Sequence, residues 1–357
     1  MQIADALKEL PDLYEKLAEE KRPVLLYGMG DGAEKIFNHL RNKRIEVKGV
    51  FASEGFVRGQ EFLGFRVMSI SEAEEEFDDF AAVLCFALEG EKAQILKLVK
   101  AKHTLYSPNL PVYGSGIFDK KRIFDNIERV QRLYDFLADE ISKEIFLSVL
   151  KYNITGEYEL LCSDKGIFSY PEGFFRHNKR HIDVGAYDGD TVIEFASRCK
   201  DYADIVAFEP DRHSYCRLLS NTTDLRAIIC ENAAVSDRDG SGELAGKGSR
   251  SSFIKSGGGN TRVVSIDSYC KQHSIGDCGI SVGSIKIDAE GADRQVLQGA
   301  VNTIYNNSPD IMVALYHRAE DFIDLPLLIR SYDYRYKLYL RKKDYIPVWD
   351  IFLLASK

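Results

Sequence analysis

Three carboxylates stand close together in the segment HIDVGAYDGDTV, residues 181–192: Asp183, Asp188 and Asp190. The segment indicates a strand, a glycine turn and a helix, which is how proteins usually bind the phosphates of a nucleotide cofactor. A like-charge contact at about 4 Å costs on the order of 4 kcal/mol at an effective dielectric constant of about 20. Asp188 and Asp190 therefore oppose a phosphate ligand and favour a cationic one. Both residues are also common helix caps, and that alternative stays open for them.

S-adenosylmethionine meets these requirements, because it has a positive sulfonium and an ammonium and no phosphate. Asp183 ends the expected strand and can accept a hydrogen bond from the ammonium, directly or through water, whereas Gly185 and Gly189 let the backbone approach the ligand closely. Glu209 ends the next apolar run, 20 residues after Gly189. A carboxylate there can accept hydrogen bonds from both ribose hydroxyls. Asn232, after the third run, would either hydrogen-bond the adenine or shape a turn.

A second group of ionisable residues stands in SIKIDAEGADRQVLQGA, residues 284–300, where Asp288 and Glu290 follow an apolar run. Ligands of open α/β sheets bind at the carboxyl ends of the strands, so Asp288 is expected beside the reacting groups. A hydroxyl that accepts a methyl group must lose its proton, and a general base contributes about 10²–10⁴-fold. Asp288, His317 and Glu290 are the candidates. Alternatively His317 is a structural hydrogen-bonding residue, Glu290 caps a helix, or the three residues hold a divalent metal.

Residues 155–357 resemble the FkbM-type S-adenosylmethionine-dependent methyltransferases in HIDVGAYDGDT, AFEPD, ENAAVSD, SIDSYC, KIDAEGADRQVLQGA, PDIMVALYHR and YLRKKDYIPVWDIFLLA. The resemblance implies O-methylation of a hydroxyl on a sugar, glycan or natural product, with Asp288 beside the reaction centre. One departure is Tyr187, where many methyltransferases have glycine. Tyr170 lies in IFSYPEGFF, which resembles a segment that folds over the cofactor. The expected cofactor site comprises Asp183, Gly185, Ala186, Gly189, Asp190, Thr191, Glu209, Asn232 and Tyr170.

The signature N/D-P-P-Y/F/W of amino-group methyltransferases is absent from the sequence, and the corresponding strand ends in D-A-E-G. This favours O-methylation over N-methylation and leaves the second reaction open. The expected cofactor is S-adenosylmethionine, the partner is a small-molecule or glycan acceptor, and no metal is assigned.

The N-terminal part has its own glycine motif, YGMGDGA, in which Gly28, Gly30 and Ala33 stand in G-x-G-x-x-A register after a strand and before a helix. The following strand ends at Ala52–Ser53, where a dinucleotide site needs a carboxylate, and Glu54 stands one position late. This part loosely resembles the Rossmann-like modules attached to sugar- and polysaccharide-modifying enzymes. We expect a degenerate domain. The alternatives are an NAD-dependent oxidoreductase or a sugar-nucleotide-binding protein acting through it, and a non-catalytic binding module.

The two glycine starts predict an α/β protein with two doubly wound Rossmann-like domains, the second with a class I methyltransferase fold and a C-terminal antiparallel hairpin. The expected boundaries are 1–118, a helical linker at 119–155, and 156–357. Residues 119–153 are expected to form one long amphipathic helix, a possible homodimer surface, and residues 246–260 a mobile loop. Expected strands are Val24–Tyr27, Glu46–Phe51, Ala81–Phe86, Ile182–Val184, Ile205–Phe208, Ala227–Cys230, Ser284–Ile287 and Ile311–Leu315.

Composition limits the classes of function. The 357 residues carry a net charge of −8, with 47 basic and 55 acidic side chains, which argues against nucleic-acid binding. No apolar run approaches the roughly 18 residues that span a bilayer, and the N-terminal sequence is unlike a signal peptide. The seven cysteines are irregularly spaced and form no C-x-x-C pair, which is typical of reduced thiols. We expect a cytoplasmic protein that does not associate with membranes.

Overall fold

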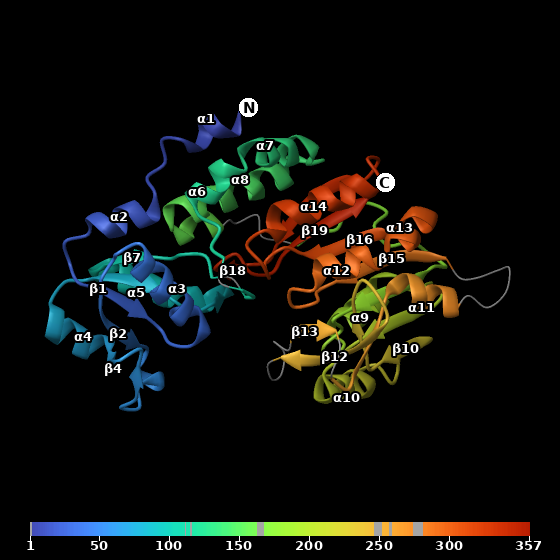
Figure 1. The fold of residues 1–357 in the computed structure, drawn as a ribbon, viewed down its shortest axis with the longest axis horizontal. Helices are drawn as coiled ribbons and strands as arrows, with labels where there is room; N and C mark the ends of the chain where they lie inside the picture. Colours follow the sequence, from blue (N-terminus) through green and yellow to red (C-terminus); the bar gives the residue numbers. More distant parts are fainter. Residues whose placement is uncertain are drawn as a thin grey trace. The chain divides into compact units, whose positions relative to one another are not determined.

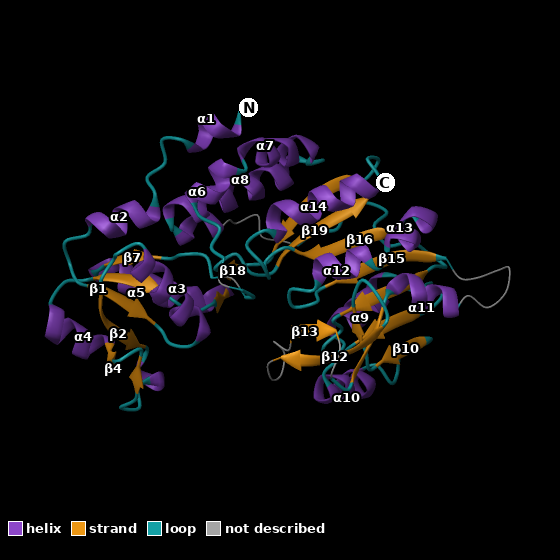
Figure 2. Ribbon diagram, viewed as in Figure 1, coloured by secondary structure: helices purple, strands orange, loops and turns teal. Residues whose placement is uncertain are grey.

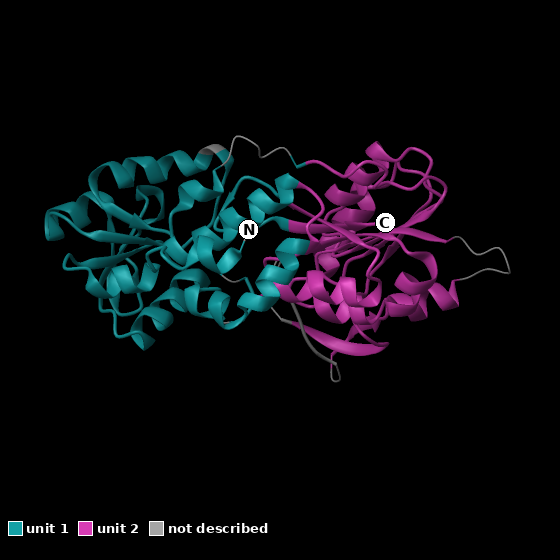
Figure 3. Cartoon of the chain, turned by 90° about the horizontal axis from the view of Figure 1, so that it is seen from above, with its two compact units in different colours: residues 1–135, 140–168, 342–351 teal, residues 136–139, 169–341, 352–357 magenta. Residues whose placement is uncertain are grey.

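The computed structural model describes residues 2–110, 112–114, 116–162, 168–245, 252–256, 259–273 and 281–357. The chain divides into two compact units, coloured separately in Figure 3. Unit 1 comprises residues 1–135, 140–168 and 342–351, and unit 2 comprises residues 136–139, 169–341 and 352–357. Both units are α/β (Figure 2), as the sequence predicts. No helix in the described ranges has the length and apolarity needed to cross a bilayer.

Unit 1 is built on a largely parallel sheet (Figure 1). β1 pairs in parallel with both β2 and β5, so the chain winds outward from a central strand in both directions. In spatial order the strands are β3 (Glu61–Phe62), β4 (Phe65–Ser69), β2 (Val47–Ala52), β1 (Val24–Tyr27), β5 (Ala81–Leu84) and β7 (Thr104–Tyr106). The three strands predicted here are confirmed to within two residues. The helices are α1 (Ile3–Leu7), α2 (Leu13–Glu19), α3 (Asp31–Asn42), α4 (Ile70–Phe77) and α5 (Gln94–Lys102).

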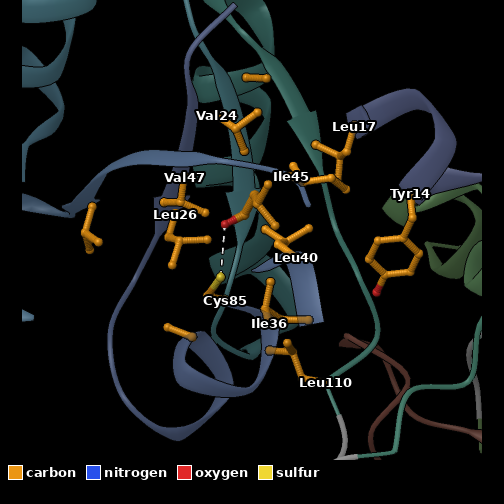
Figure 4. Close-up of a cluster of buried hydrophobic side chains, with 14 of the residues drawn as sticks. Tyr14, Leu17, Val24, Leu26, Ile36, Leu40, Ile45, Val47, Cys85 and Leu110 are labelled. Atoms are coloured by element: carbon orange, nitrogen blue, oxygen red, sulfur yellow. Dashed lines mark hydrogen bonds between the residues drawn. The ribbon is translucent and has the colours of Figure 1, made fainter. Parts of the chain in front are cut away.

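The core of unit 1 forms where α3 packs on the sheet (Figure 4). Ile36 and Leu40 stand four residues apart, on one face of the helix, and are fully buried with Val24 and Leu26 of β1. Cys85 is buried in the same cluster, and its thiol donates to the carbonyl of Val83 at 3.2 Å. All six cysteines in the described ranges are free.

The region 119–153 is three helices, so the prediction of one long helix is wrong. They are α6 (Lys120–Asp125), α7 (Ile127–Phe136) and α8 (Glu140–Thr155). Between α7 and α8, Leu137 forms a parallel bridge with Leu338 of unit 2, and the amide of Ala138 donates to the carbonyl of Leu338 at 2.8 Å. A backbone that pairs as a strand cannot continue a helix, so a contact distant in the sequence ends the periodic pattern.

Unit 2 contains a mixed sheet in which β8 pairs in parallel with β9 and β15. In spatial order its strands are β10 (Ile228–Glu231), β9 (Ile205–Phe208), β8 (Arg180–Val184), β15 (Val282–Ile287), β16 (Asp310–Ala314), β19 (Ile351–Ser356) and β17 (Lys337–Lys342). The five predicted strands of this unit are present. The two C-terminal runs form the neighbouring strands β17 and β19, and β19 is antiparallel to β16.

Two details of this region differ from the sequence prediction. The connection between β17 and β19 is not a short turn, since it contains β18 (Tyr345–Ile346), which pairs with β6 (Leu88–Glu89) in unit 1. Ser252–Ser256, expected in a mobile loop, form strand β13, which pairs with β12. The rest of that loop lies partly outside the described residues. The small second sheet is β11 (Ala234–Val235), β14 (Thr261–Val264), β12 (Gly240–Ala245) and β13 (Ser252–Ser256).

Several helices of unit 2 follow strands of the main sheet, so each of these strand–helix junctions is a loop at the end of a strand. They are α9 (Asp190–Arg198), α10 (Arg212–Asn221), α11 (Ile266–Gln272), α12 (Asp293–Gln298), α13 (Val301–Asn307) and α14 (Asp321–Tyr332). α9 follows β8, α10 follows β9, and α12 follows β15. The loops at these three junctions lie at the carboxyl ends of adjacent parallel strands, which is the edge where an open α/β sheet binds its ligand.

The packing of unit 1 predicts a large effect of Leu40→Ala. Leu40 has no exposed surface, so the variant should lose about 2–5 kcal/mol of unfolding free energy. The single tryptophan, Trp349, packs against this core, and its indole donates to the carbonyl of Leu110 at 2.7 Å. Its fluorescence during urea unfolding therefore reports on unit 1.

The matched control is Leu98→Ala, because Leu98 is 71% exposed. This variant should change the unfolding free energy by less than about 0.5 kcal/mol. Equal effects of the two substitutions would contradict the described core.

Candidate functional site

The loop from Gly185 to Gly189 connects β8 to α9 and has an unusual backbone. Gly185, Tyr187 and Gly189 adopt left-handed conformations, with φ of 75°, 49° and 93°. A Cβ on Gly185 would lie 1.9 Å from the carbonyl oxygen of Asp288, so this glycine is required where the loop meets the end of β15. A Cβ on Gly189 would lie 3.0 Å from the side chains of α10. Packing within the chain therefore explains these two glycines. The sequence alone predicts instead that they let the backbone approach a ligand.

Asp183 is held inside the unit by two partners. It has no exposed surface; its Oδ2 accepts from the hydroxyl of Thr191 at 2.6 Å, and its Oδ1 lies 3.0 Å from Nζ of Lys286. Lys286 also donates to the carbonyl of Gly185 at 2.8 Å. Burial alone would lower the pKa of Lys286, but the carboxylates of Asp183 and Asp288 outweigh it and raise the pKa. Through Thr191 and Lys286, Asp183 therefore holds the loop from Gly185 to Gly189 in place.

Glu209 follows β9 and is 7% exposed. Its Oε1 accepts from the amide of Asp211 and its Oε2 from the amide of Tyr187, both at 2.8 Å. Burial raises the pKa of Glu209 to about 7, although these two N–H groups favour the charged form. The side-chain amide of Asn232 donates to the carbonyls of Glu209 and Pro210, at 2.9 and 3.1 Å. Asn232 thus shapes the turn that holds Glu209, which was one of its two predicted roles.

The other predicted loop residues lie at the start of α9. The amide of Ala186 donates to the carbonyl of Phe208 at 3.0 Å. Gly189 is the N-cap residue of α9, so neither acidic neighbour fills that position. Asp190 is the first helical residue and accepts from the amide of Thr191 at 2.7 Å. Asp188 is not a cap, because its carboxylate instead lies 3.7 Å from Arg217.

Sequence reasoning missed the support that α10 gives this loop. The guanidinium of Arg217 lies 4.5 Å from the ring centroid of Tyr187, and the side chain of Asn221 donates to the carbonyl of Asp188 at 2.8 Å. A cation over an aromatic face contributes about 0.5–1 kcal/mol at exposed sites. No sequence signal identifies either residue, because their partners lie in another element.

Tyr170 packs against α9. Its hydroxyl donates to Glu194 at 3.4 Å, and its ring lies 4.6 Å from that of Phe175 and 5.0 Å from the guanidinium of Arg198. Burial raises the pKa of this phenol. Tyr170 also lines a cavity of about 30 Å³ that includes Lys286. The described contacts place Tyr170 on the α9 side of the loop.

The predicted catalytic candidates do come together at the carboxyl edge of the sheet. His317, which follows β16, has no exposed surface. Its Nε2 lies 3.1 Å from Oδ1 of Asp288 and 3.8 Å from Oε2 of Glu290, and its Nδ1 lies 2.8 Å from Oδ2 of Asp293. The hydroxyl of Tyr316 donates to Asp288 at 3.2 Å. Asp293 and Tyr316 are members of this cluster that sequence reasoning missed.

The charges of this cluster determine which member can accept a proton. Burial alone would lower the pKa of His317, but Asp293 and Asp288 outweigh it and hold the pKa well above its usual value. Burial would raise the pKa of Asp288, yet His317 and Lys286 lower it. These shifts favour the protonated form of His317 and the charged form of Asp288. In the described ranges no group of three or more His, Cys, Asp or Glu side chains is arranged to hold a metal.

The glycine motif of unit 1 has structural partners. A Cβ on Gly28 would lie 2.5 Å from the ring of Phe86, and Asp31 at the start of α3 pairs with Lys35 at 2.6 Å. Ser53, at the position of the usual ribose-binding carboxylate, lies 2.9 Å from the hydroxyl of Tyr27. Each of these contacts is formed between residues of unit 1.

Lys286→Met tests whether the buried ion pair holds the loop. The variant leaves the Asp183 carboxylate without its cation, and breaking a buried pair in this way costs about 3–5 kcal/mol. Urea unfolding followed by circular dichroism should show this loss.

Lys179→Met is the matched control, because its ammonium is exposed and its partner among the residues that the structure describes is the hydroxyl of Ser281. It should change the unfolding free energy by less than about 0.5 kcal/mol. If Lys286→Met is as stable as this control, the ion pair does not hold the loop.

Known proteins share both the sequence pattern and the fold. The family model described as the methyltransferase FkbM domain matches residues 183–336. The crystal structure of methyltransferase FkbM from Methylobacillus flagellatus KT is 21% identical, with 99% of this chain and 97% of that chain covered and a TM-score of 0.70. A curated relative, flap endonuclease Xni from Colwellia psychrerythraea, is 33% identical over 122 residues, which are 34% of this chain. The chain spans only 37% of the length of that relative.

The family match covers the strands and loops that hold Asp183, Glu209, Asp288 and His317, and the fold likeness extends over nearly the whole chain. Residues 183–336, within the second unit, therefore match the model of the methyltransferase FkbM domain, and the chain has the fold of the methyltransferase FkbM structure.

Proposed function

We propose that unit 2 is an S-adenosylmethionine-dependent O-methyltransferase that acts on a hydroxyl of a sugar, glycan or natural product. The observation that supports this most is the placement of three acidic groups at adjacent strand ends. Glu209 follows β9, Asp183 ends β8, and Asp288 follows β15, and these strands are neighbours in the order β9-β8-β15. Such an edge suits a ligand with a ribose and positive charges.

The residues present fit this cofactor. Glu209 is a buried carboxylate whose two oxygens are oriented by backbone amides, and it would accept hydrogen bonds from the ribose hydroxyls. Asp183 is buried and paired with Thr191 and Lys286, so we expect it to position the loop as well as to contribute negative charge near the cofactor. When bound, the cofactor supplies a methyl group on a positively charged sulfur that is a good leaving group.

Asp288 is the proton acceptor in this proposal. A bond forms between the acceptor oxygen and the methyl carbon while the carbon–sulfur bond breaks, and its electron pair goes to sulfur. The hydroxyl proton passes to the carboxylate of Asp288 and then to solvent. Because His317 lies between the carboxylates of Asp293 and Asp288, which raise its pKa, we assign this role to Asp288. The resemblance and the D-A-E-G strand end support oxygen as the acceptor atom.

Glu209→Gln tests the cofactor site. The amide replaces one accepting oxygen by a donor and removes the charge, so about 1.5–3 kcal/mol of binding free energy should be lost. This corresponds to an approximately 10–150-fold rise in the Kd of S-adenosylhomocysteine, measured by isothermal titration calorimetry.

Glu46 of unit 1, whose side chain is 74% exposed, provides the control, and Glu46→Gln should bind as tightly as the wild type. Transfer of labelled methyl groups to a panel of sugars and natural-product hydroxyls then tests the acceptor class. Binding of NADH without binding of S-adenosylhomocysteine would overturn the proposal in favour of an oxidoreductase.

The affinity should also depend on pH. The pKa of Glu209 is raised to about 7, so the free protein carries a protonated Glu209 below that pH and must release the proton to bind ribose through a carboxylate. The Kd of S-adenosylhomocysteine should therefore be constant above about pH 8 and rise by up to about tenfold per pH unit below about pH 6. Glu209→Gln should abolish this dependence. A wild-type Kd that does not change between these limits would show that Glu209 does not titrate on binding.

A further inference from the structure

Asp293 joins two parts of the site that lie far apart in the sequence. It is the first residue of α12 and has no exposed surface. Its Oδ1 accepts from the amide of Ala289 at 2.9 Å, and its Oδ2 accepts from the amide of Gly291 at 3.2 Å. The same Oδ2 lies 2.8 Å from Nδ1 of His317. One carboxylate thus connects the turn after β15 with the residue that follows β16.

The turn that Asp293 holds has a demanding backbone. Glu290 and Gly291 are both left-handed, with φ of 48° and 95°, and a side-chain-bearing residue is disfavoured there. The guanidinium of Arg318 donates to the carbonyl of Gly291 at 2.7 Å, and the amide of Asp288 donates to the carbonyl of Val184 at 3.0 Å. The orientation of the Asp288 side chain therefore depends on this turn, and the buried carboxylate of Asp293 stabilises the turn by accepting hydrogen bonds from its backbone amides.

The donor chemistry of His317 follows from the same geometry. Each ring nitrogen faces a carboxylate, Asp293 at Nδ1 and Asp288 at Nε2, and an ionised carboxylate only accepts hydrogen bonds. A neutral imidazole has one N–H and would leave one of these contacts between two acceptors. Only the imidazolium carries an N–H for the hydrogen bond at Nδ1 and a positive charge for the 3.1 Å ion pair at Nε2, so the charges alternate from Asp183 through Lys286, Asp288 and His317 to Asp293.

We infer that Asp293 and His317 form a positioning pair, in which Asp293 keeps His317 doubly protonated so that the imidazolium, ion-paired at Nε2, orients the Asp288 carboxylate toward the methyl acceptor. The inference rests on the proposed methyl transfer and adds to it a residue that is neither cofactor ligand nor base. Asp293 acts through His317, and His317 acts through Asp288.

Other ionisable groups face this pair. Glu290 lies 3.8 Å from Nε2 of His317, and the hydroxyl of Tyr316 donates to Asp288. Asp321, at the start of α14, is buried beside them, and its carboxylate accepts from the amide of Arg318 at 3.0 Å. Burial, with a further contribution from Asp293, raises the pKa of Asp321 to about 7. Asp321 is not placed against a ring nitrogen, so it provides a matched control.

The first measurement needs neither cofactor nor activity. Histidine-selective ¹⁵N labelling of the full chain, with His317→Gln to assign the resonance, reports the protonation of both ring nitrogens. His317 should remain doubly protonated well above the ordinary histidine pKa of about 6.5. A wild-type His317 that titrates near its ordinary value overturns the inference whatever the activity. If the wild-type protein transfers no methyl group, the proposed function is contradicted instead. The failure of the inference and the failure of the proposed function can therefore be distinguished.

The second measurement uses Asp293→Asn, whose amide oxygen can still accept from a backbone N–H but carries no charge. His317 should then titrate within the range of about pH 6–8, and kcat at pH 8 should fall by about 10²-fold at saturating cofactor. Much of this loss should be recovered near pH 6, where His317 regains its proton. The Kd of S-adenosylhomocysteine should change by less than about threefold, because Asp293 does not face the cofactor loop.

Asp321→Asn should leave kcat at pH 8 within about threefold of the wild type. A merely structural role of Asp293 would lower kcat equally at all pH values, and this result would overturn the inference. Retention of wild-type kcat by Asp293→Asn at pH 8 would do the same. If Asp293→Asn does not fold, the protonation state of His317 in the wild-type protein tests the inference.

Discussion

The carboxyl edge of the unit 2 sheet depends on one buried cation, the ammonium of Lys286, which lies between the carboxylates of Asp183 and Asp288. A charged group that leaves water loses several kcal/mol of solvation, so each of these three groups needs the others. Lys286 also donates to the carbonyl of Gly185 and thereby fixes the loop after β8 against the end of β15. The absence of a Cβ at Gly185 permits this approach, and the amide of the same loop then orients Glu209. Lys286 thus contributes both to the packing of the loop and to the balance of charge at the site.

This arrangement explains why an acidic glycine loop is compatible with a stable protein. Two buried carboxylates at this edge are individually compensated inside the unit, Asp183 by Lys286 and Asp288 by His317. Glu209 differs, because in the described part of the chain its direct partners are two backbone amides and not a cation. Burial raises its pKa, and hydrogen-bond donors that arrive with a ligand would favour its charged form. A cofactor with ribose hydroxyls and positive charge suits that requirement.

The sequence predicted what is encoded locally. The strand ends at Glu209 and Asp288 were found because strand, turn and helix patterns mark the carboxyl edge of a parallel sheet. The contacts that decide their chemistry were not predicted. Asp293 reads as an ordinary first-turn helix residue, and only the fold brings it to His317. For the same reason the break after α7 was missed, since it is caused by the pairing of Leu137 with a strand that comes much later in the chain.

A crystal structure of the full chain with S-adenosylhomocysteine is the most direct test of the central claim, that the edge formed by β9, β8 and β15 binds a ribose-containing methyl donor. The account predicts both ribose hydroxyls within hydrogen-bonding distance of Glu209 and the sulfur on the side of Asp288. A ligand bound in unit 1, or a Glu209 that still contacts only backbone amides at saturating ligand, would contradict it.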